Sequence, residues 1–202
     1  MSASKYDPKA FDWSASAYAD ADRYLARRAE VIATLGPPLQ PGDTLLDLAC
    51  GDGGLADYLP AGVRYIGVDA SESMVAAARA RGRDVVHGDL NEYVPPSRVA
   101  ATSCFRAIYY ARDRRAFFEL VRSYTDKKLV FDLNPRQFAA SEVRADAHAA
   151  GFARFDARPF FVPQRHALAP PLAWLLQALE RAGPLTRALL RVRFTYVCSA
   201  SP

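Results

Sequence analysis

The feature that most constrains the fold is the segment TLLDLACGDGGLADY at residues 44–58. Its first half is an apolar run, which is typical of a buried strand in a parallel sheet. The run ends in the small residues of ACGDGG, after which apolar residues return at helical spacing. Small residues at a strand-to-helix turn let a ligand approach the backbone where larger side chains would block it. The segment therefore predicts a ligand-binding turn between a strand and a helix.

Acidic residues stand at or near the ends of three predicted strands. Asp47 lies in the first strand, Asp69 ends the strand RYIGVD, and Asp89 follows the strand at residues 84–87. A carboxylate at the end of the second strand can accept hydrogen bonds from both hydroxyls of a ribose, and one after the third can accept from an adenine amino group. The three carboxylates are therefore predicted to surround one pocket for a cofactor that contains a nucleoside.

The glycine turn by itself leaves two classes of cofactor open. Gly51, Gly53 and Ala56 fit the G-x-G-x-x-G/A pattern of turns that bind a nicotinamide dinucleotide, and an acidic residue follows at a suitable distance. Asp47 and Asp52 argue against a dinucleotide, because carboxylates close to a pyrophosphate would repel it. The position of Asp47 suits a cationic ligand group instead. A sulfonium-bearing amino-acid nucleoside has no phosphate and carries an ammonium group, so it fits the acidic pocket better.

The rest of the chain alternates between strand and helix patterns. Helices are predicted at residues 11–35, 53–59, 71–81, 112–124, 140–150, 171–181 and 185–190. Strands are predicted at residues 43–49, 63–69, 84–87, 99–104, 128–133, 152–162 and 191–198. This alternation predicts one α/β domain over residues 1–202, with a doubly wound, mostly parallel sheet and helices on both faces. Ligands of such sheets bind at the carboxyl ends of the strands.

Composition narrows the class of protein further. Half of the 202 residues are hydrophobic, which is enough for a sizeable core, and no run of about 18 apolar residues predicts a membrane span. The net charge is +4, but the basic residues form no run of five or more, so we expect no nucleic-acid partner. Cys50, Cys104 and Cys198 lack the spacing of a metal site or a disulfide framework. We therefore expect no metal and a reduced, cytoplasmic protein.

Taken together, the motifs resemble those of the class I S-adenosylmethionine-dependent methyltransferases, in the branch that acts on small molecules. LLDLACGDGG resembles the first motif of the family, YIGVDASESMVAAAR the second and VVHGDL the third. SCFRAIYYARDRRAFFELVR resembles the segment after the fourth strand. The resemblance covers roughly residues 11–198. It implies a Rossmann-like sheet of seven strands with an antiparallel last strand, S-adenosylmethionine as the cofactor and S-adenosylhomocysteine as the product.

The resemblance also implies which residues contact the cofactor. The turn residues that would pass beneath its methionine part are Ala49, Cys50, Gly51 and Gly53. Asp69 would hold the ribose, and Asp47 completes the acidic surroundings. The residues that would flank or bind the adenine are Ala70, Met74, Asp89 and Leu90. Those that would lie near the sulfonium are Cys104 and Phe105.

The acceptor side of the pocket is less defined by sequence. Methyl transfer is an in-line displacement, so alignment and exclusion of water are the main tasks, and a base is needed only if the acceptor must lose a proton. The candidates for that base are His166 and Tyr109. Candidate acceptor-binding residues follow the fourth and fifth strands or lie in the N-terminal helix, and they are Tyr18, Arg106, Tyr109, Tyr110, Asn134 and Arg136.

Two segments outside the motifs invite more than one interpretation. The N-terminal helix at 11–35 either closes over the cofactor as a lid or packs on the domain. The helical insertion at 167–190 either packs on the sheet or faces a lipophilic substrate or a lipid surface.

The sequence thus predicts methyl transfer to O, N or C of a small-molecule acceptor, as in specialised metabolism. A second hypothesis is a methyltransferase-like protein that binds the cofactor or a protein partner without transferring methyl groups. Methylation of lipids or of RNA is a further alternative, and the absence of a basic tail disfavours RNA. We expect a monomer or a homodimer.

Overall fold

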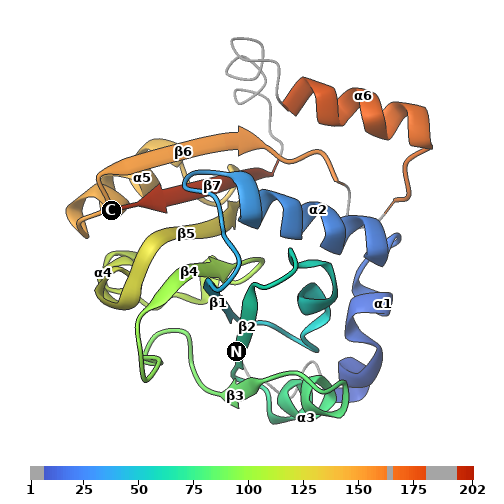
Figure 1. Cartoon of the computed structure of the whole chain (residues 1–202). Coiled ribbons are helices and arrows are strands. Elements are labelled where there is room, and N and C mark those ends of the chain that lie inside the picture. The colour runs from blue at the N-terminus through green and yellow to red at the C-terminus, as the bar shows by residue number, and fades with distance from the viewer. Residues whose placement is uncertain (1–6, 163–165, 181–194) are drawn as a thin grey trace.

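The structure is a computed structural model that describes residues 7–162, 166–180 and 195–202. Within these residues the strands form one sheet with the spatial order β3-β2-β1-β4-β5-β7-β6 (Figure 1). Its strands are β1 (Thr44–Leu48), β2 (Arg64–Asp69), β3 (Val85–His87), β4 (Val99–Cys104), β5 (Thr125–Leu133), β6 (Arg154–Pro159) and β7 (Tyr196–Ser201). Strand β7 runs antiparallel to both of its neighbours, whereas β1 to β5 pair in parallel. The predicted doubly wound sheet of seven strands is therefore confirmed.

Helices cover both faces of this sheet. The α-helices are α1 (Trp13–Ala17), α2 (Ala21–Thr34), α3 (Glu72–Ala80), α4 (Arg114–Tyr124), α5 (Ala140–Ala149) and α6 (Pro170–Glu180). Short 3-10 helices are η2 (Asp7–Asp12), η3 (Gly54–Tyr58) and η4 (Ile108–Tyr110). Alternate residues of β1 face opposite layers: Leu45 belongs to the core cluster that includes α2 and η3, and Leu46 to the cluster that includes α4 and α5. Strand β1 is buried along its whole length, as its apolar sequence predicts.

The N-terminal segment departs from the predicted single helix. Tyr18 has extended backbone angles and ends α1, and Asp20 then caps α2 by accepting a hydrogen bond from the Arg23 amide at 3.0 Å. Apolar spacing continues across this break, so periodicity alone does not reveal it, although an aspartate before a helical run is a start signal. The resulting corner separates α1 from α2 and directs α1 toward the carboxyl ends of the strands (Figure 1).

Other predicted boundaries shift by a few residues. Strand β5 begins at Thr125, directly after α4, and β6 is shorter than the predicted strand at 152–162. The predicted helix at 53–59 is the 3-10 helix η3, and β7 extends to Ser201, past the predicted end at residue 198. The predicted helix at 185–190 and the start of the last strand at residues 191–194 lie outside the described residues.

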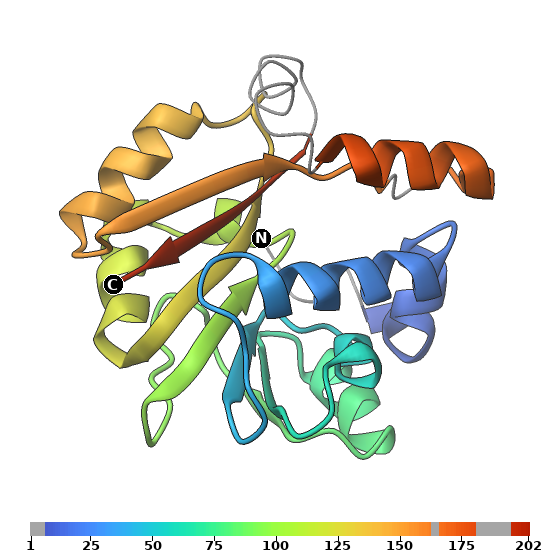
Figure 2. The same cartoon turned by 45° about the horizontal axis from the view of Figure 1, so that its top comes forward.

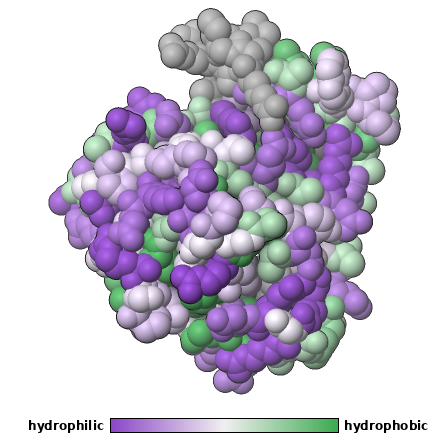
Figure 3. Space-filling view, viewed as in Figure 1, coloured by the Kyte–Doolittle hydropathy of each residue, from purple (hydrophilic) through white to green (hydrophobic). Residues whose placement is uncertain are grey.

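Helix α6 lies beside α2 in both views of the molecule (Figures 1 and 2). A buried ion pair joins them, because Arg27 of α2 donates to Glu180 of α6, and the other oxygen of Glu180 accepts from the Phe161 amide at 2.7 Å. The outer side of α6 exposes Leu172, Trp174 and Leu175. Apolar residues accordingly reach the surface in this part of an otherwise largely polar face (Figure 3). No helix of the described residues combines the length and apolar character of a membrane span.

Candidate functional site

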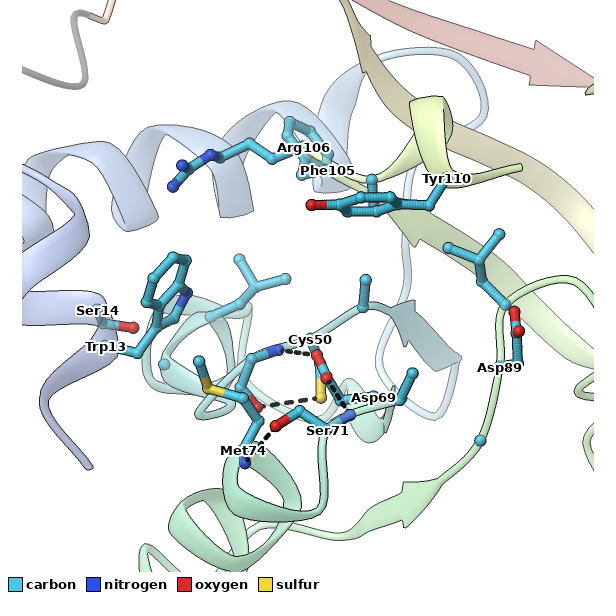
Figure 4. A pocket seen from close by; sticks show the side chains of 18 of the residues that line it. Trp13, Ser14, Cys50, Asp69, Ser71, Met74, Asp89, Phe105, Arg106 and Tyr110 are labelled. Atoms are coloured by element: carbon cyan, nitrogen blue, oxygen red, sulfur yellow. Dashed lines mark hydrogen bonds between the residues drawn. The ribbon is translucent and has the colours of Figure 1, made fainter. Parts of the chain in front are cut away.

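A cavity of about 560 Å³ opens at the carboxyl ends of β1, β2 and β4. Its size lies within the roughly 300–1,000 Å³ of typical small-molecule sites. The loops after these strands and the loop after β3 supply its floor and one side, while α1 and α2 supply the opposite side (Figure 4). The site therefore lies where an open α/β sheet binds its ligands.

The turn after β1 forms the floor of the cavity and is sharply bent. Ala49, Gly51 and Gly53 have φ angles of 55°, 60° and 69°, which is the left-handed region that favours glycine. Backbone strain at a non-glycine residue such as Ala49 is typical of functional sites. A Cβ atom at Gly51 would lie 2.8 Å from Cδ1 of Trp13, so this position has no room for a side chain.

The carboxylate of Asp69 is held in place by two backbone amides. The Gly51 amide donates to Oδ2 at 2.8 Å, and the Ser71 amide donates to Oδ1 at 2.9 Å. Burial raises the pKa of Asp69, and these hydrogen bonds offset the increase in part. Each carboxylate oxygen has a second lone pair, and the side chain lines the cavity. Asp69 can therefore accept two further hydrogen bonds from a diol.

The carboxylate of Asp89 lies at the other end of the cavity and is paired with a cation. Its Oδ1 accepts from the Asn91 amide at 2.9 Å, and its Oδ2 accepts from Nη2 of Arg112 at 2.7 Å. Burial works to raise the pKa of Asp89, but the hydrogen bonds of Asn91 and the charge of Arg112 lower it overall. Arg112 also pairs with Glu92, which ties the loop after β3 to the loop after η4.

Asp47 does not line the cavity, contrary to the sequence-based expectation. It is fully buried beneath the turn, where it pairs with Nη2 of Arg28 at 2.5 Å and accepts from Ser103 Oγ at 2.6 Å. The group that faces the cavity is the guanidinium of Arg28, which lies 4.5 Å from the ring centroid of Phe105. The Nε atom of Arg28 is buried and has no hydrogen-bond acceptor among the described residues. This wall of the cavity therefore offers a hydrogen-bond donor of an ion-paired guanidinium instead of the carboxylate of Asp47.

Comparison with known proteins agrees with this geometry. Residues 45–128 match the model of a family described as a methyltransferase domain. The chain has a class I methyltransferase fold. None of the curated proteins matches the chain. The match to a methyltransferase domain supports S-adenosylmethionine as the cofactor, in agreement with the sequence-based prediction.

Solved structures resemble the methyltransferase fold of this chain over almost its full length, at low sequence identity. A chain from the complex between the Haloferax volcanii Trm112 methyltransferase activator and a methyltransferase has a TM-score of 0.66 at 20% identity, covering 98% of this chain and 97% of that chain. A TehB-like methyltransferase from Corynebacterium glutamicum has a TM-score of 0.65 at 14% identity, covering 98% and 97%. Phosphoethanolamine N-methyltransferase 2 from Haemonchus contortus has a TM-score of 0.62 at 16% identity, covering 100% and 60%.

Most of the residues that were predicted to contact the cofactor do line this cavity. They are Ala49, Cys50, Gly51, Asp69, Ala70, Met74, Asp89, Leu90 and Phe105. Besides Asp47, two expected residues lie outside it. The side chain of Cys104 is buried on the α4 side of the sheet. Gly53 is the N-cap residue before η3, and a Cβ atom there would face Arg83 and Ala78.

The acceptor-side residues divide in the same way. Those that line the cavity are Tyr18, Arg106, Tyr109 and Tyr110. Asn134 and Arg136 do not, because they form an exposed turn after β5 in which Asn134 Oδ1 accepts the Arg136 amide at 3.0 Å. His166 is exposed and also lies outside the cavity, so the structure does not place it beside a ligand.

Asp52 holds the N-terminal helix against the turn, a role that was not predicted from the sequence. Asp52 is almost fully buried, and it accepts from the Ser14 amide at 3.1 Å and from Ser14 Oγ at 2.5 Å. Arg81 donates to the same carboxylate at 2.9 Å. Through these contacts α1 places Trp13 over Gly51. The sequence does show an aspartate, Asp52, inside the glycine turn. It was expected to face the ligand and repel a pyrophosphate, whereas it faces α1.

The methyltransferase cavity fits S-adenosylmethionine. The carboxylate of Asp69 matches a ribose diol, and the turn at Gly51, which has no side chain, leaves room for an aliphatic chain. The unpartnered Nε of Arg28 matches a carboxylate. Among the described residues, no group of three or more His, Cys, Asp or Glu side chains is arranged to hold a metal ion.

Proposed function

We propose that this protein is an enzyme that transfers the methyl group of S-adenosylmethionine to an O, N or C atom of a small-molecule acceptor. The observation that carries this proposal is the position of Asp69. Its two oxygens are oriented by the amides of Gly51 and Ser71 and remain open to the cavity. A carboxylate held in this way at the end of the second strand suits a ribose diol.

The surrounding residues support a complete arrangement of the cofactor. Asp69 binds the ribose. The residues around the adenine are Ala70, Met74, Asp89 and Leu90, and the methionine part lies over the turn at residues 49–51. Arg28 takes the methionine carboxylate, because it lines the cavity and its Nε has no acceptor within the described structure. This assignment replaces the direct role expected for Asp47.

The proposed chemistry depends mainly on alignment. When bound, the cofactor supplies a sulfonium methyl group: the acceptor lone pair forms a bond to the methyl carbon as the carbon–sulfur bond breaks, and a neutral thioether leaves. Trp13, Tyr18 and Phe105 shield this region from water, which favours a reaction in which charge on sulfur is lost. Of the candidate bases, Tyr109 lines the cavity at its mouth, where its side chain is 43% exposed. Proximity accounts for most of the expected rate enhancement.

The variant Asp69→Asn tests this function. It keeps the shape of the side chain but removes the charge and one acceptor oxygen, so we expect S-adenosylhomocysteine to bind on the order of 10–100 times more weakly. Isothermal titration calorimetry measures this loss. Asp126→Asn is the matched control, because Asp126 is half exposed and pairs with Arg98 on the surface. Equal affinities for the wild type and Asp69→Asn would contradict the proposed site.

Four further expectations from the sequence stay proposals. They are the single domain, a state of monomer or homodimer, a cytoplasmic location, and an acceptor that is a small molecule rather than RNA or lipid. Of these four, the nature of the acceptor is the one about which the residues lining the cavity give the most direct information.

A further inference from the structure

The cavity contains three arginines, and one of them differs from the others. Arg28 pairs with Asp47, and Arg112 pairs with Asp89, so the charge of each is balanced. Arg106 lines the same cavity, and its guanidinium forms no ion pair among the described residues, although the buried carboxylate of Asp132 lies near enough for the two charges to interact. A cation in a partly enclosed site without a direct ion pair gains stability when a ligand supplies an anion.

The backbone and two aromatic rings hold Arg106 in this position. Its φ angle is 56°, which is strained for a residue with a side chain, and its amide donates to Oδ1 of Asp132 at 2.6 Å. The guanidinium carbon lies 5.6 Å from the ring centroid of Trp13 and 5.4 Å from that of Tyr18. Such cation–π contacts fix the plane of the guanidinium and leave its edge free to donate.

One donor atom of Arg106 still lacks a partner. Its Nη1 is buried and makes no hydrogen bond within the described part of the chain. Burial works to lower the pKa of Arg106, but the nearby hydroxyl of Tyr18 raises it overall, so the side chain stays charged. A buried charged donor that is left unsatisfied is costly, and this arrangement is typical of a site that a ligand completes.

In the proposed function, Arg28 binds the methionine carboxylate of the cofactor. The cofactor then has no anionic group left for Nη1 of Arg106. S-adenosylmethionine carries a sulfonium and an ammonium against a single carboxylate, so binding it adds positive charge beside Arg106. Figure 4 shows Arg106 across the cavity from Cys50, with its guanidinium on the side of Trp13. Arg106 follows the end of β4 and therefore borders the space above the turn that is left for the acceptor.

We propose that the methyl acceptor carries an anionic group, a carboxylate or a phosphate, that Arg106 binds through its guanidinium. The planar fork of an arginine matches both groups and can donate two parallel hydrogen bonds to them. The anion would balance the charge that the cofactor brings and satisfy Nη1 of Arg106. This inference rests on the proposed function and adds a substrate class to it.

The test uses the full chain saturated with S-adenosylhomocysteine and three aromatic probes: phenylacetate, phenyl phosphate and the neutral phenylacetamide. Tyr109 and Tyr110 at the cavity provide surfaces for the aromatic ring of each probe. We expect at least one anionic probe to bind ten or more times more tightly than the amide in calorimetry. The ratio of the two anionic affinities shows whether the site prefers a carboxylate or a phosphate.

Variants assign this preference to one side chain. Arg106→Gln should abolish the preference and leave the affinity for S-adenosylhomocysteine within about twofold, and Arg106→Lys should keep part of it. Arg115→Gln is the matched control: Arg115 lies on the exposed side of α4, pairs with Glu119, and should keep the full preference. Circular dichroism of each variant confirms that it is folded.

Three results would overturn the inference alone. They are an amide that binds as tightly as both anions, no binding of any probe to the loaded protein, and a loss of S-adenosylhomocysteine affinity in Arg106→Gln with the anion preference intact. The last result would assign Arg106 to the cofactor. Failure of the wild type to bind S-adenosylhomocysteine would instead overturn the proposed function, and this inference with it.

Discussion

At the scale of single residues, neighbours decide what each carboxylate near the cavity can do. Asp47 is fully buried and neutralised by Arg28, whereas Asp69 receives only amide hydrogen bonds on its oxygens and stays open to the cavity. Asp89 shares its charge with Arg112 at the surface. Asp47 therefore has a structural role, whereas Asp69 is proposed to bind the ribose and Asp89 the adenine.

A buried lysine gives a prediction that concerns stability rather than function. Lys128 is fully buried, and its Nζ donates to the carbonyl oxygens of Ala33 at 3.3 Å and Leu35 at 2.8 Å. Burial lowers its pKa to about 8, from about 10.4 in an unfolded chain. Between these two values the unfolded state binds more protons, so this group makes the folded state more stable as the pH rises.

We expect the wild type to gain stability over Lys128→Met, by about 2 kcal/mol, between pH 7 and pH 9.5. Urea denaturation at both pH values measures the two free energies of unfolding. Other titrating groups are common to both proteins and cancel in the comparison. A difference between wild type and variant that does not change with pH would contradict the lowered pKa.

At the scale of elements, the break between α1 and α2 is the feature that shapes the cavity. Because α1 turns away at Tyr18, its Ser14 reaches Asp52 and its Trp13 covers Gly51. If this helix is the lid that the sequence analysis proposes, its attachment to the glycine turn should control how quickly the cofactor leaves.

Ser14→Ala tests the lid. The variant keeps the amide hydrogen bond to Asp52 but removes the hydroxyl, which leaves the buried carboxylate short of one donor. We expect S-adenosylhomocysteine to dissociate on the order of ten times faster, with a similar association rate, in stopped-flow tryptophan fluorescence. Ser16→Ala is the matched control within α1, because Ser16 is exposed and bonds only locally to the Trp13 carbonyl. Identical dissociation rates in the two variants would show that the contact does not hold a lid.

At the scale of the whole molecule, local sequence patterns predict the sheet and most of the cavity residues that are expected to contact the cofactor. The alternation of apolar strands with helices predicts the doubly wound sheet, and residues at strand ends, such as Asp69 and Phe105, reach the cavity because parallel strands end at one edge. Contacts between distant segments are not predictable in this way. The pairing of Arg28 with Asp47 depends on how α2 packs across β1.

The acceptor side shows the same limit. Asn134 follows a strand as Arg106 does, but the turn after β5 leads it to the surface, and no local pattern distinguishes the two positions. Arg106 is identified by its surroundings, since Trp13 and Tyr18 come from a segment that is far away in the sequence.

The central claim is that this cavity binds S-adenosylmethionine and not a dinucleotide. Calorimetric titration of the wild-type chain with S-adenosylhomocysteine and, separately, with NADH tests it most directly. We predict one site of micromolar affinity for S-adenosylhomocysteine and binding of NADH that is at least 100 times weaker, because Trp13 lies against the turn at Gly51, where the pyrophosphate of a dinucleotide would have to sit. Tight binding of NADH together with weak or absent binding of S-adenosylhomocysteine would contradict the account.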